Sequence, residues 1–149
     1  MELGTLGAVL RFAIELEGQS AEFYQEAASL AKHSLAEGVL LALAEAKRKR
    51  KELLERSRRE YINEMLLEPI AGLRGSDYLI ERELSSKMSH YDALRLAIEL
   101  EENSRRFYFD GVGRVNLPEL TRVFEKLGEE NADHKLRLDS LHNKEGPGA

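Results

Sequence analysis

Two glutamates and one histidine are the residues of this sequence best suited to bind metal ions. Glu17, Glu101 and His134 each lie on a stripe of apolar residues that recurs at helical spacing. Carboxylates neutralise divalent cations, and imidazoles complete their coordination. A spacing of three or four residues places such side chains on one face of a helix. These three residues therefore indicate a polar cluster inside a helical core, and a metal site is one interpretation of it.

Four stretches of sequence supply the stripes on which these residues lie. The stripes are Leu6, Leu10, Ala13, Glu17, Ser20 and Tyr24; Leu40, Leu43, Lys47, Arg50, Leu54 and Tyr61; Leu94, Ala97, Glu101, Ser104 and Tyr108; and Leu120, Phe124, Leu127, Asn131, His134, Leu138 and Leu141. A charged side chain on an apolar stripe requires a partner if it is buried. We therefore expect one core polar cluster, consisting of Glu17, Tyr24, Lys47, Arg50, Glu101, Tyr108, Asn131 and His134.

The stripes occur in two pairs that repeat along the chain. Residues 13–24 match residues 97–108 at eight of twelve positions, with an offset of 84 residues. The same offset continues into the second stripe of each pair, where it relates Leu43 to Leu127. Chance similarity between amphipathic helices does not readily give a gapless register over two helices. We therefore interpret the chain as a tandem duplication of one helix pair.

Turn residues divide the chain into the parts of a single four-helix domain. We expect repeat one at about 5–65, a connector at about 66–88, repeat two at about 89–143 and a loose tail at 144–149. The connector contains prolines and glycines that interrupt helices, with a short extra helix expected over 77–84. A long connector after the second helix lets the second and third helices run in the same direction, as in bundles with a single crossover.

Helix starts are expected where serine or asparagine precedes a periodic stretch. Ser34 and Ser89 each have an acidic residue three positions later, which is the pattern of a capping box. The second helix is expected to run from about Leu35 to about Met65. Asn116 is expected to cap the last helix, with Pro118 in its first turn.

Two phrases that contain Glu17 and Glu101 resemble the rubrerythrin-type branch of the ferritin-like superfamily. They read Ala-Ile-Glu-Leu-Glu-Gly-Gln-Ser-Ala-Glu-Phe-Tyr and Ala-Ile-Glu-Leu-Glu-Glu-Asn-Ser-Arg-Arg-Phe-Tyr. In that family a metal-binding glutamate lies seven residues before the tyrosine, which corresponds here to Glu17 before Tyr24 and Glu101 before Tyr108. The resemblance covers nearly all of residues 5–143 except the connector. It implies an all-α, ferritin-like four-helix bundle with a di-iron site.

The expected ligand set departs from that family at three of its six positions. The family carries a Glu-x-x-His motif in each of the other two helices, and the matching positions hold Lys47 with Arg50 and Asn131 with His134. Lysine and arginine are protonated at pH 7 and repel a metal cation. With neutral Asn131 and His134, the two cations balance the two glutamates. We therefore expect side-chain cations in place of the metals and no cofactor.

The expected function is a non-catalytic binding or structural protein with a largely lost metal site. The alternative is a di-iron-type oxidoreductase or metal-handling protein that retains iron or another divalent metal through Glu17, Glu101, His134 and Asn131. A second alternative is an interaction protein that uses the basic face of the second helix, where eight lysines or arginines fall within 47–59. That stretch contains no aromatic residues, so nucleic acid is not the expected partner.

Composition narrows the class of protein further. The 149 residues suit one domain, and 42% hydrophobic with 33% charged residues excludes a wholly disordered chain. The absence of cysteine excludes disulfides and thiolate metal sites. The net charge is -5, and no apolar run approaches the roughly 20 residues of a membrane span. We expect a cytoplasmic protein without a secretory signal, and we keep a homodimer open because dimers are the commonest assembly.

Overall fold

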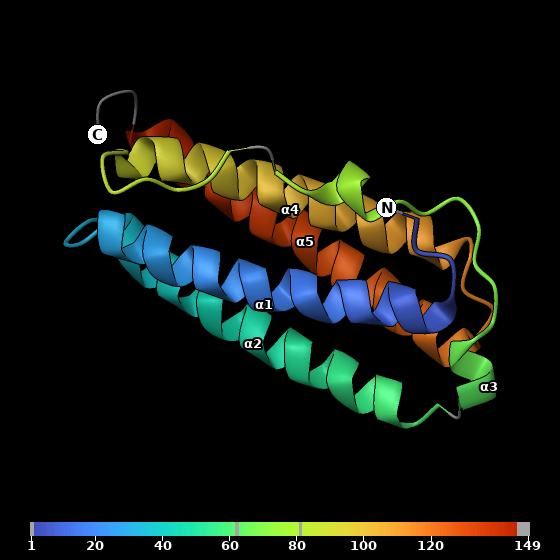
Figure 1. Cartoon of the computed structure of the whole chain (residues 1–149). Coiled ribbons are helices and arrows are strands. Elements are labelled where there is room, and N and C mark those ends of the chain that lie inside the picture. The colour runs from blue at the N-terminus through green and yellow to red at the C-terminus, as the bar shows by residue number, and fades with distance from the viewer. Residues whose placement is uncertain (1, 62, 81, 146–149) are drawn as a thin grey trace.

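The chain folds into a bundle of helices that lie side by side (Figure 1). The computed structural model describes residues 2–61, 63–80 and 82–145. The elements are α1 (Leu6–Leu30), α2 (Leu35–Arg59), α3 (Asn63–Leu66), the 3-10 helix η1 (Gly75–Tyr78), α4 (His90–Val112) and α5 (Pro118–Glu145). Within the described ranges, β-type pairing is limited to isolated bridges, such as Thr5 with Pro69. The all-α fold class expected from the sequence is confirmed.

The four long helices form two antiparallel pairs, joined by a connector that runs the length of the bundle (Figure 1). α1 packs mainly on α2, and α4 packs mainly on α5. After α2 and α3, the connector returns along the bundle to the opposite end before α4 begins. α2 and α4 therefore run in the same direction, which is the arrangement of a single-crossover bundle. No helix in the described residues combines the length and apolar character that a bilayer crossing requires.

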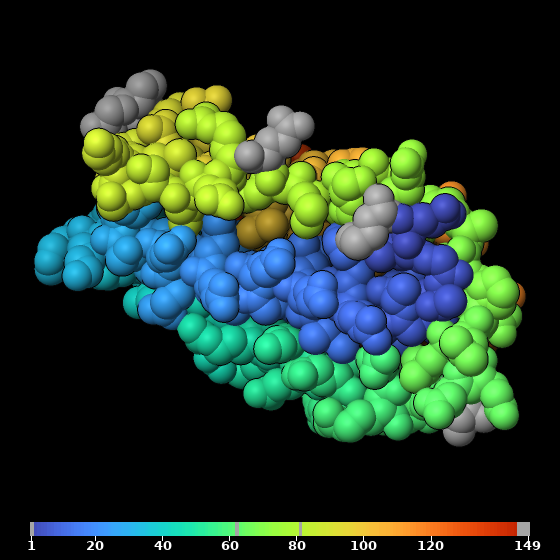
Figure 2. Space-filling view, in the orientation of Figure 1, coloured from blue at the N-terminus to red at the C-terminus, as the bar shows by residue number. Residues whose placement is uncertain are grey.

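The connector is fastened to the bundle by backbone bonds and by one buried tyrosine. The N–H of Leu3 donates to the carbonyl of Leu73 at 2.8 Å. Tyr78 packs against Phe107 and donates its hydroxyl to Asp110 at 2.7 Å. The space-filling view shows a hollow between the connector and α1 (Figure 2), with a volume of about 420 Å³. Tyr78 therefore holds the connector on α4 while part of the adjoining groove remains open.

The short helix in the connector lies earlier than the sequence predicts. The expected segment was 77–84, whereas η1 covers Gly75–Tyr78 and the next residue, Leu79, has an extended backbone. Tyr78 is 3% exposed, so its burial fixes the helical turn at this point. Gly72 has a φ of +82°, a conformation that glycine adopts without steric cost and that redirects the chain before η1.

α2 also ends earlier than the sequence predicts. The helix was expected to reach about Met65, but it ends at Arg59. The N–H groups of Glu60 and Tyr61 each donate to the carbonyl three residues earlier at 3.2 Å, which tightens the last turn into 3-10 geometry. Residue 62 lies outside the described residues, and α3 begins at Asn63 as a separate short helix.

Both serine caps form, but among the described residues neither of the expected capping boxes has its second bond, from the serine N–H to the acidic side chain. The Oγ of Ser89 accepts from the N–H of Asp92 at 3.2 Å, as expected. The Oγ of Ser34 accepts from Ala36 at 3.2 Å. The N–H of Ser34 is already bonded to the carbonyl of Ala31 at 3.0 Å, so this donor is satisfied by the preceding turn and needs no bond from a glutamate side chain.

Both ends of α5 differ from the expected positions. The helix begins at Pro118, two residues after Asn116, so Asn116 does not occupy the capping position. The helix continues to Glu145, although a loose tail was expected from residue 144 onward. The Nε2 atom of His90 lies 2.7 Å from a carboxylate oxygen of Glu145, which holds the end of α5 against the start of α4. Residues 146–149 of the expected tail lie outside the described residues.

The apolar core is divided into two clusters along the bundle. One cluster includes Leu10 and Phe124, and the other includes Leu40 and Leu94. The polar residues of the four stripes lie in the sequence between the members of these clusters. The core therefore contains a polar layer with apolar packing on either side.

Replacing Gly111 with alanine is expected to destabilise the bundle. A Cβ at this position would lie 2.6 Å from the ring of Phe124, which is fully buried. Overpacking of this kind costs about 1–3 kcal/mol, which exceeds the roughly 1 kcal/mol that alanine gains over glycine in a helix. The measurement is urea denaturation of Gly111→Ala beside Gly113→Ala, whose added Cβ meets only a backbone oxygen at 3.9 Å. Equal stability of the two variants would contradict the expectation.

Candidate functional site

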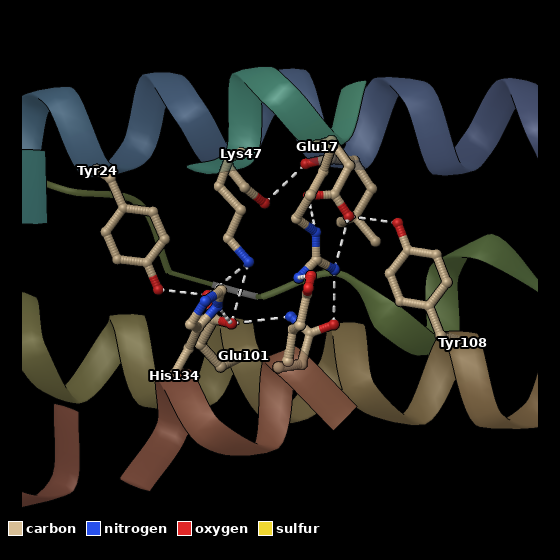
Figure 3. A network of polar contacts seen from close by, with 11 residues as sticks. Glu17, Tyr24, Lys47, Glu101, Tyr108 and His134 are labelled. Carbon is tan, nitrogen blue, oxygen red and sulfur yellow. Dashed lines mark hydrogen bonds and ion pairs between the residues drawn. The ribbon is translucent and has the colours of Figure 1, made fainter. Parts of the chain in front are cut away.

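Polar side chains from all four long helices meet in the middle of the core (Figure 3). They are Glu17 and Tyr24 of α1, Lys47 and Arg50 of α2, Glu101 and Tyr108 of α4, and Asn131 and His134 of α5. Seven of them are at most 5% exposed, and the side chain of His134 is 15% exposed. The structure thus brings together the residues of the core polar cluster that the sequence places on the four stripes.

Glu101 accepts contacts from three helices. The Nζ atom of Lys47 lies 3.0 Å from Oε1 and 2.9 Å from Oε2 of Glu101. The side-chain amide of Asn131 donates to Oε1 at 2.8 Å, and the hydroxyl of Tyr24 donates to Oε2 at 2.5 Å. The Nδ1 atom of His134 lies 3.2 Å from Oε1. Both carboxylate oxygens therefore have partners, one of which is a full positive charge.

Glu17 is neutralised by Arg50. The Nε atom of Arg50 lies 3.1 Å from Oε1, and Nη2 donates to Oε2 at 3.1 Å. The same Nη2 donates to the carbonyl oxygen of the Asn131 side chain at 2.8 Å. Asn131 therefore connects the two halves of the cluster, because its amide nitrogen donates to Glu101 while its oxygen accepts from Arg50.

The two tyrosines pair with the glutamates in a reciprocal pattern. Tyr24 donates to Glu101, and Tyr108 donates to Glu17, so each hydroxyl crosses between the two helix pairs. Figure 3 shows the two rings at opposite ends of the cluster. Burial, followed by the nearby carboxylates, raises the pKa of both tyrosines well above 10. Their hydroxyls therefore remain protonated donors, and the contacts follow the same 84-residue offset as the sequence.

Opposing effects set the protonation of the buried ions. Burial is the largest single effect on Glu101 and would raise its pKa, but Lys47, His134 and Tyr24 together hold this pKa below its ordinary value of 4.5. Burial is the largest single effect on Arg50 and would lower its pKa, but Glu17, Tyr108 and Glu101 together hold this pKa above its ordinary value. Burial, followed by the charge of Arg50, lowers the pKa of Lys47. Arg50 is therefore the permanent cation of the cluster, and Lys47 is the one that loses its proton first as the pH rises.

The residues at the expected ligand positions fit side-chain cations better than divalent metal ions. Lys47 contacts both oxygens of Glu101, and the guanidinium of Arg50 contacts both oxygens of Glu17. A metal ion bound to either carboxylate would lie beside a fixed positive charge. Asn131 directs its oxygen to Arg50. Among the described residues, no group of three or more histidine, cysteine, aspartate or glutamate side chains is placed to hold a metal ion.

Two solved structures share this arrangement of helices. A candidate ferritin-like diiron-carboxylate protein from Thermotoga maritima superposes with a TM-score of 0.84, over 98% of this chain and 99% of its own, at 16% sequence identity. A hypothetical protein from Pyrococcus furiosus superposes with a TM-score of 0.72, over 93% of this chain and 88% of its own, at 24% identity. This chain has the ferritin-like fold. No protein-family model matches its sequence, and no curated protein matches it either.

In the ferritin-like bundle, the core polar cluster has a further charged contact that the sequence patterns did not indicate. Glu130 of α5 approaches the Nη1 atom of Arg50, with 3.8 Å between the nitrogen and Oε1. Glu130 is adjacent to Asn131 and four residues before His134, so the helical spacing of polar residues on α5 was the signal that could have identified it. Its side chain is 38% exposed, which places it where the cluster meets the surface.

Replacing Arg50 with leucine is expected to destabilise the protein by about 3 kcal/mol, because Glu17 would remain buried without its counter-ion. The measurement is the free energy of unfolding of Arg50→Leu in urea. Arg48→Leu on the same helix is the control, since Arg48 is 47% exposed and its pairing with Glu45 is of the weak surface kind, worth about 0.2–1 kcal/mol. A loss below about 0.5 kcal/mol for Arg50→Leu would contradict a dry, paired cluster.

Acid is expected to unfold the protein partly through Glu101. Because the pKa of Glu101 is lower in the folded state than its ordinary value of 4.5, the unfolded chain binds more protons below that pH. The ion pair therefore contributes its full stability above about pH 5, and this contribution is lost as the pH falls through the folded-state pKa. The measurement is the ¹³C shift of the Glu101 carboxyl group between pH 7 and pH 2.5. A titration midpoint at or above 4.5 would contradict the expectation.

Proposed function

We propose that this ferritin-like bundle is a non-catalytic binding or structural protein in which an internal ion-pair layer has replaced a two-metal site. The main observation in support of the proposal is the position of Lys47, whose ammonium contacts both carboxylate oxygens of the buried Glu101 in the middle of the bundle. Di-metal bundles of this fold bind their ions between the four helices through glutamate and histidine side chains. The similar structure from Thermotoga maritima is a candidate diiron-carboxylate protein.

Charge balance supports the replacement. Two divalent cations would supply positive charge to buried carboxylates, and a bundle that lost them would leave Glu17 and Glu101 uncompensated. An uncompensated buried charge costs several kcal/mol. Lys47 and Arg50 provide two positive charges at the positions where the family resemblance implies ligands, and with neutral Asn131 the ion pairs sum to zero. The two side-chain cations of the core polar cluster thus neutralise the buried glutamates, as bound metal ions would, without a coordination site.

The reciprocal tyrosine contacts support descent from a duplicated helix pair of the rubrerythrin type. Two copies that face each other would place Tyr24 beside Glu101 and Tyr108 beside Glu17, which are the contacts observed. Lys47 and Asn131 occupy corresponding positions in the two copies, and both contact Glu101. At these positions the two copies therefore do not make the reciprocal contacts that the tyrosines make. The ion pairs are therefore the feature that distinguishes this bundle from a symmetric two-metal site.

The rival function is a metal-handling protein or oxidoreductase that retains an ion through Glu17, Glu101, His134 and Asn131. An ion at Glu101 would have to displace Lys47 from both carboxylate oxygens. It would also have to compete with Arg50 for the oxygen of Asn131. Elemental analysis of protein purified without a chelator separates the two functions, since the rival requires stoichiometric metal at these residues.

Restoring the ligand pattern is expected to create a metal site. The substitutions Lys47→Glu, Arg50→His and Asn131→Glu change the cluster from neutral to a charge of about minus four with neutral histidines, which balances two divalent cations. Without metal the crowded carboxylates should destabilise the triple variant. Its melting temperature should rise when ferrous, cobalt or manganese ions are added, because a ligand that binds the native state stabilises it. The parent protein should show little or no such rise.

The matched control carries the same change of charge at exposed positions. Lys32→Glu, Arg48→His and Asn116→Glu lie outside the cluster and should give no metal-dependent rise in melting temperature. Two outcomes would overturn the proposal. One is a parent protein that already binds two metal ions per chain at the cluster. The other is a folded triple variant that does not respond to metal, because its six positions would then not converge on an ion.

A further inference from the structure

A cleft between α2 and α5 concentrates positive charge on one side of the bundle. Its volume is about 440 Å³. Among the described residues that line it, the cations are Lys49, Arg50 and Arg56 of α2 and Lys126 of α5, and the carboxylate is that of Glu130. Arg50 also neutralises the buried Glu17, so the excess of positive charge comes from the other three cations. The whole chain has a net charge of -5, so this excess of positive charge is local. The cleft therefore favours an anionic ligand over a cation.

Lys49 and Lys126 are free to bind such a ligand. Both side chains are exposed, and among the described residues neither has a carboxylate oxygen within 4.0 Å. They project from the two helices that form opposite walls of the cleft. Arg56 adds a third cation, although it also lines a depression with Glu52 and Glu55. Charges on both walls can contact one anion from two sides.

A buried donor lies at the inner wall of the same cleft. Arg50 is 5% exposed, and its Nη1 atom makes no hydrogen bond. The nearest carboxylate oxygen belongs to Glu130, at 3.8 Å, which is beyond hydrogen-bonding distance. Buried donors are almost always satisfied in native proteins, so this atom is a donor that a water molecule or an anionic ligand in the cleft can satisfy.

We propose that this cleft binds a small organic anion that carries a phosphate group. The phosphate would be contacted by Lys49 and Lys126, and its oxygens would accept from Nη1 of Arg50 once the half-exposed Glu130 side chain rotates away. Leu53 and Leu127 also line the cleft and would contact the organic part of the ligand. The volume falls within the range of about 300–1,000 Å³ that is typical of small-molecule sites. This proposal does not depend on whether the ion-pair layer replaced metals.

The chemistry of the lining favours a small ligand over a nucleic acid. Among the described residues, no phenylalanine, tyrosine or tryptophan lines the cleft. The imidazole of His134 lines it, but this side chain is only 15% exposed and is held against Glu101, so unpaired bases would lack an open surface on which to stack. Free phosphate shares the same anionic group but does not reach the leucines. Comparing inorganic phosphate with phenyl phosphate therefore separates binding of the anion alone from binding of an organic phosphate.

The test is isothermal titration of the full chain with inorganic phosphate and with phenyl phosphate at constant ionic strength. We expect one molecule of phenyl phosphate per chain, bound more tightly than inorganic phosphate. Lys49→Ala and Lys126→Ala should each weaken binding about tenfold, which corresponds to the loss of one charge-assisted contact. Arg11→Ala is the matched control, since Arg11 is exposed on α1 outside the cleft and its removal should leave the affinity unchanged.

Glu130→Gln provides a variant that should gain affinity. The substitution removes the one carboxylate that repels the ligand and keeps the size of the side chain, so phenyl phosphate should bind several-fold more tightly. Circular dichroism establishes that each variant is folded. The proposal is overturned if neither probe binds, if inorganic phosphate binds as tightly as phenyl phosphate, or if Arg11→Ala weakens binding as much as Lys126→Ala. Tight binding of a single-stranded nucleic acid without binding of either probe would also overturn it.

Discussion

Neutralisation of two buried carboxylates is the constraint on which the rest of this bundle depends. Glu17 and Glu101 are fully buried, and their ion-pair partners, Arg50 and Lys47, both lie on α2. An unpaired charge at such a site costs several kcal/mol, which is a large part of the roughly 5–15 kcal/mol that stabilises a typical domain. α2 must therefore place one cation against its own partner α1 and the other against α4. This requirement sets the rotation and register of α2 in the bundle.

The hydrogen bonds of the core polar cluster favour one arrangement of the four helices over others. Asn131 donates to Glu101 and accepts from Arg50, so α5 is tied to both α4 and α2. The tyrosines add one donor to each glutamate from opposite ends of the layer. A polar network of this kind disfavours helix arrangements that would break its hydrogen bonds. The apolar clusters on either side bury the ion pairs, and burial strengthens each contact.

Arg50 connects the interior of the bundle with its surface. One side of its guanidinium neutralises Glu17, and the remaining nitrogen, Nη1, lies at the cleft between α2 and α5 without a hydrogen bond. The ordinary packing of the fold explains this cleft, because α2 packs mainly on α1 and α5 mainly on α4. Metal chemistry and anion binding at these helices would require opposite local charge. The proposed replacement of metal ligands by Lys47 and Arg50 would therefore change which ions the bundle can accept.

Helical periodicity in the sequence was enough to predict the all-α class and the side chains that line the core, because the face on which a residue lies depends on local spacing alone. The prolines and glycines after the second helix were enough to predict the long connector. Periodicity did not determine which cation pairs with which glutamate. That choice depends on how α2 is rotated against α1 and α4, and only the tertiary structure places Lys47 on Glu101 and Arg50 on Glu17. The approach of Glu130 to Arg50 was decided in the same way. Each depends on contacts between helices, and a pattern within one helix does not encode the distance to its neighbour.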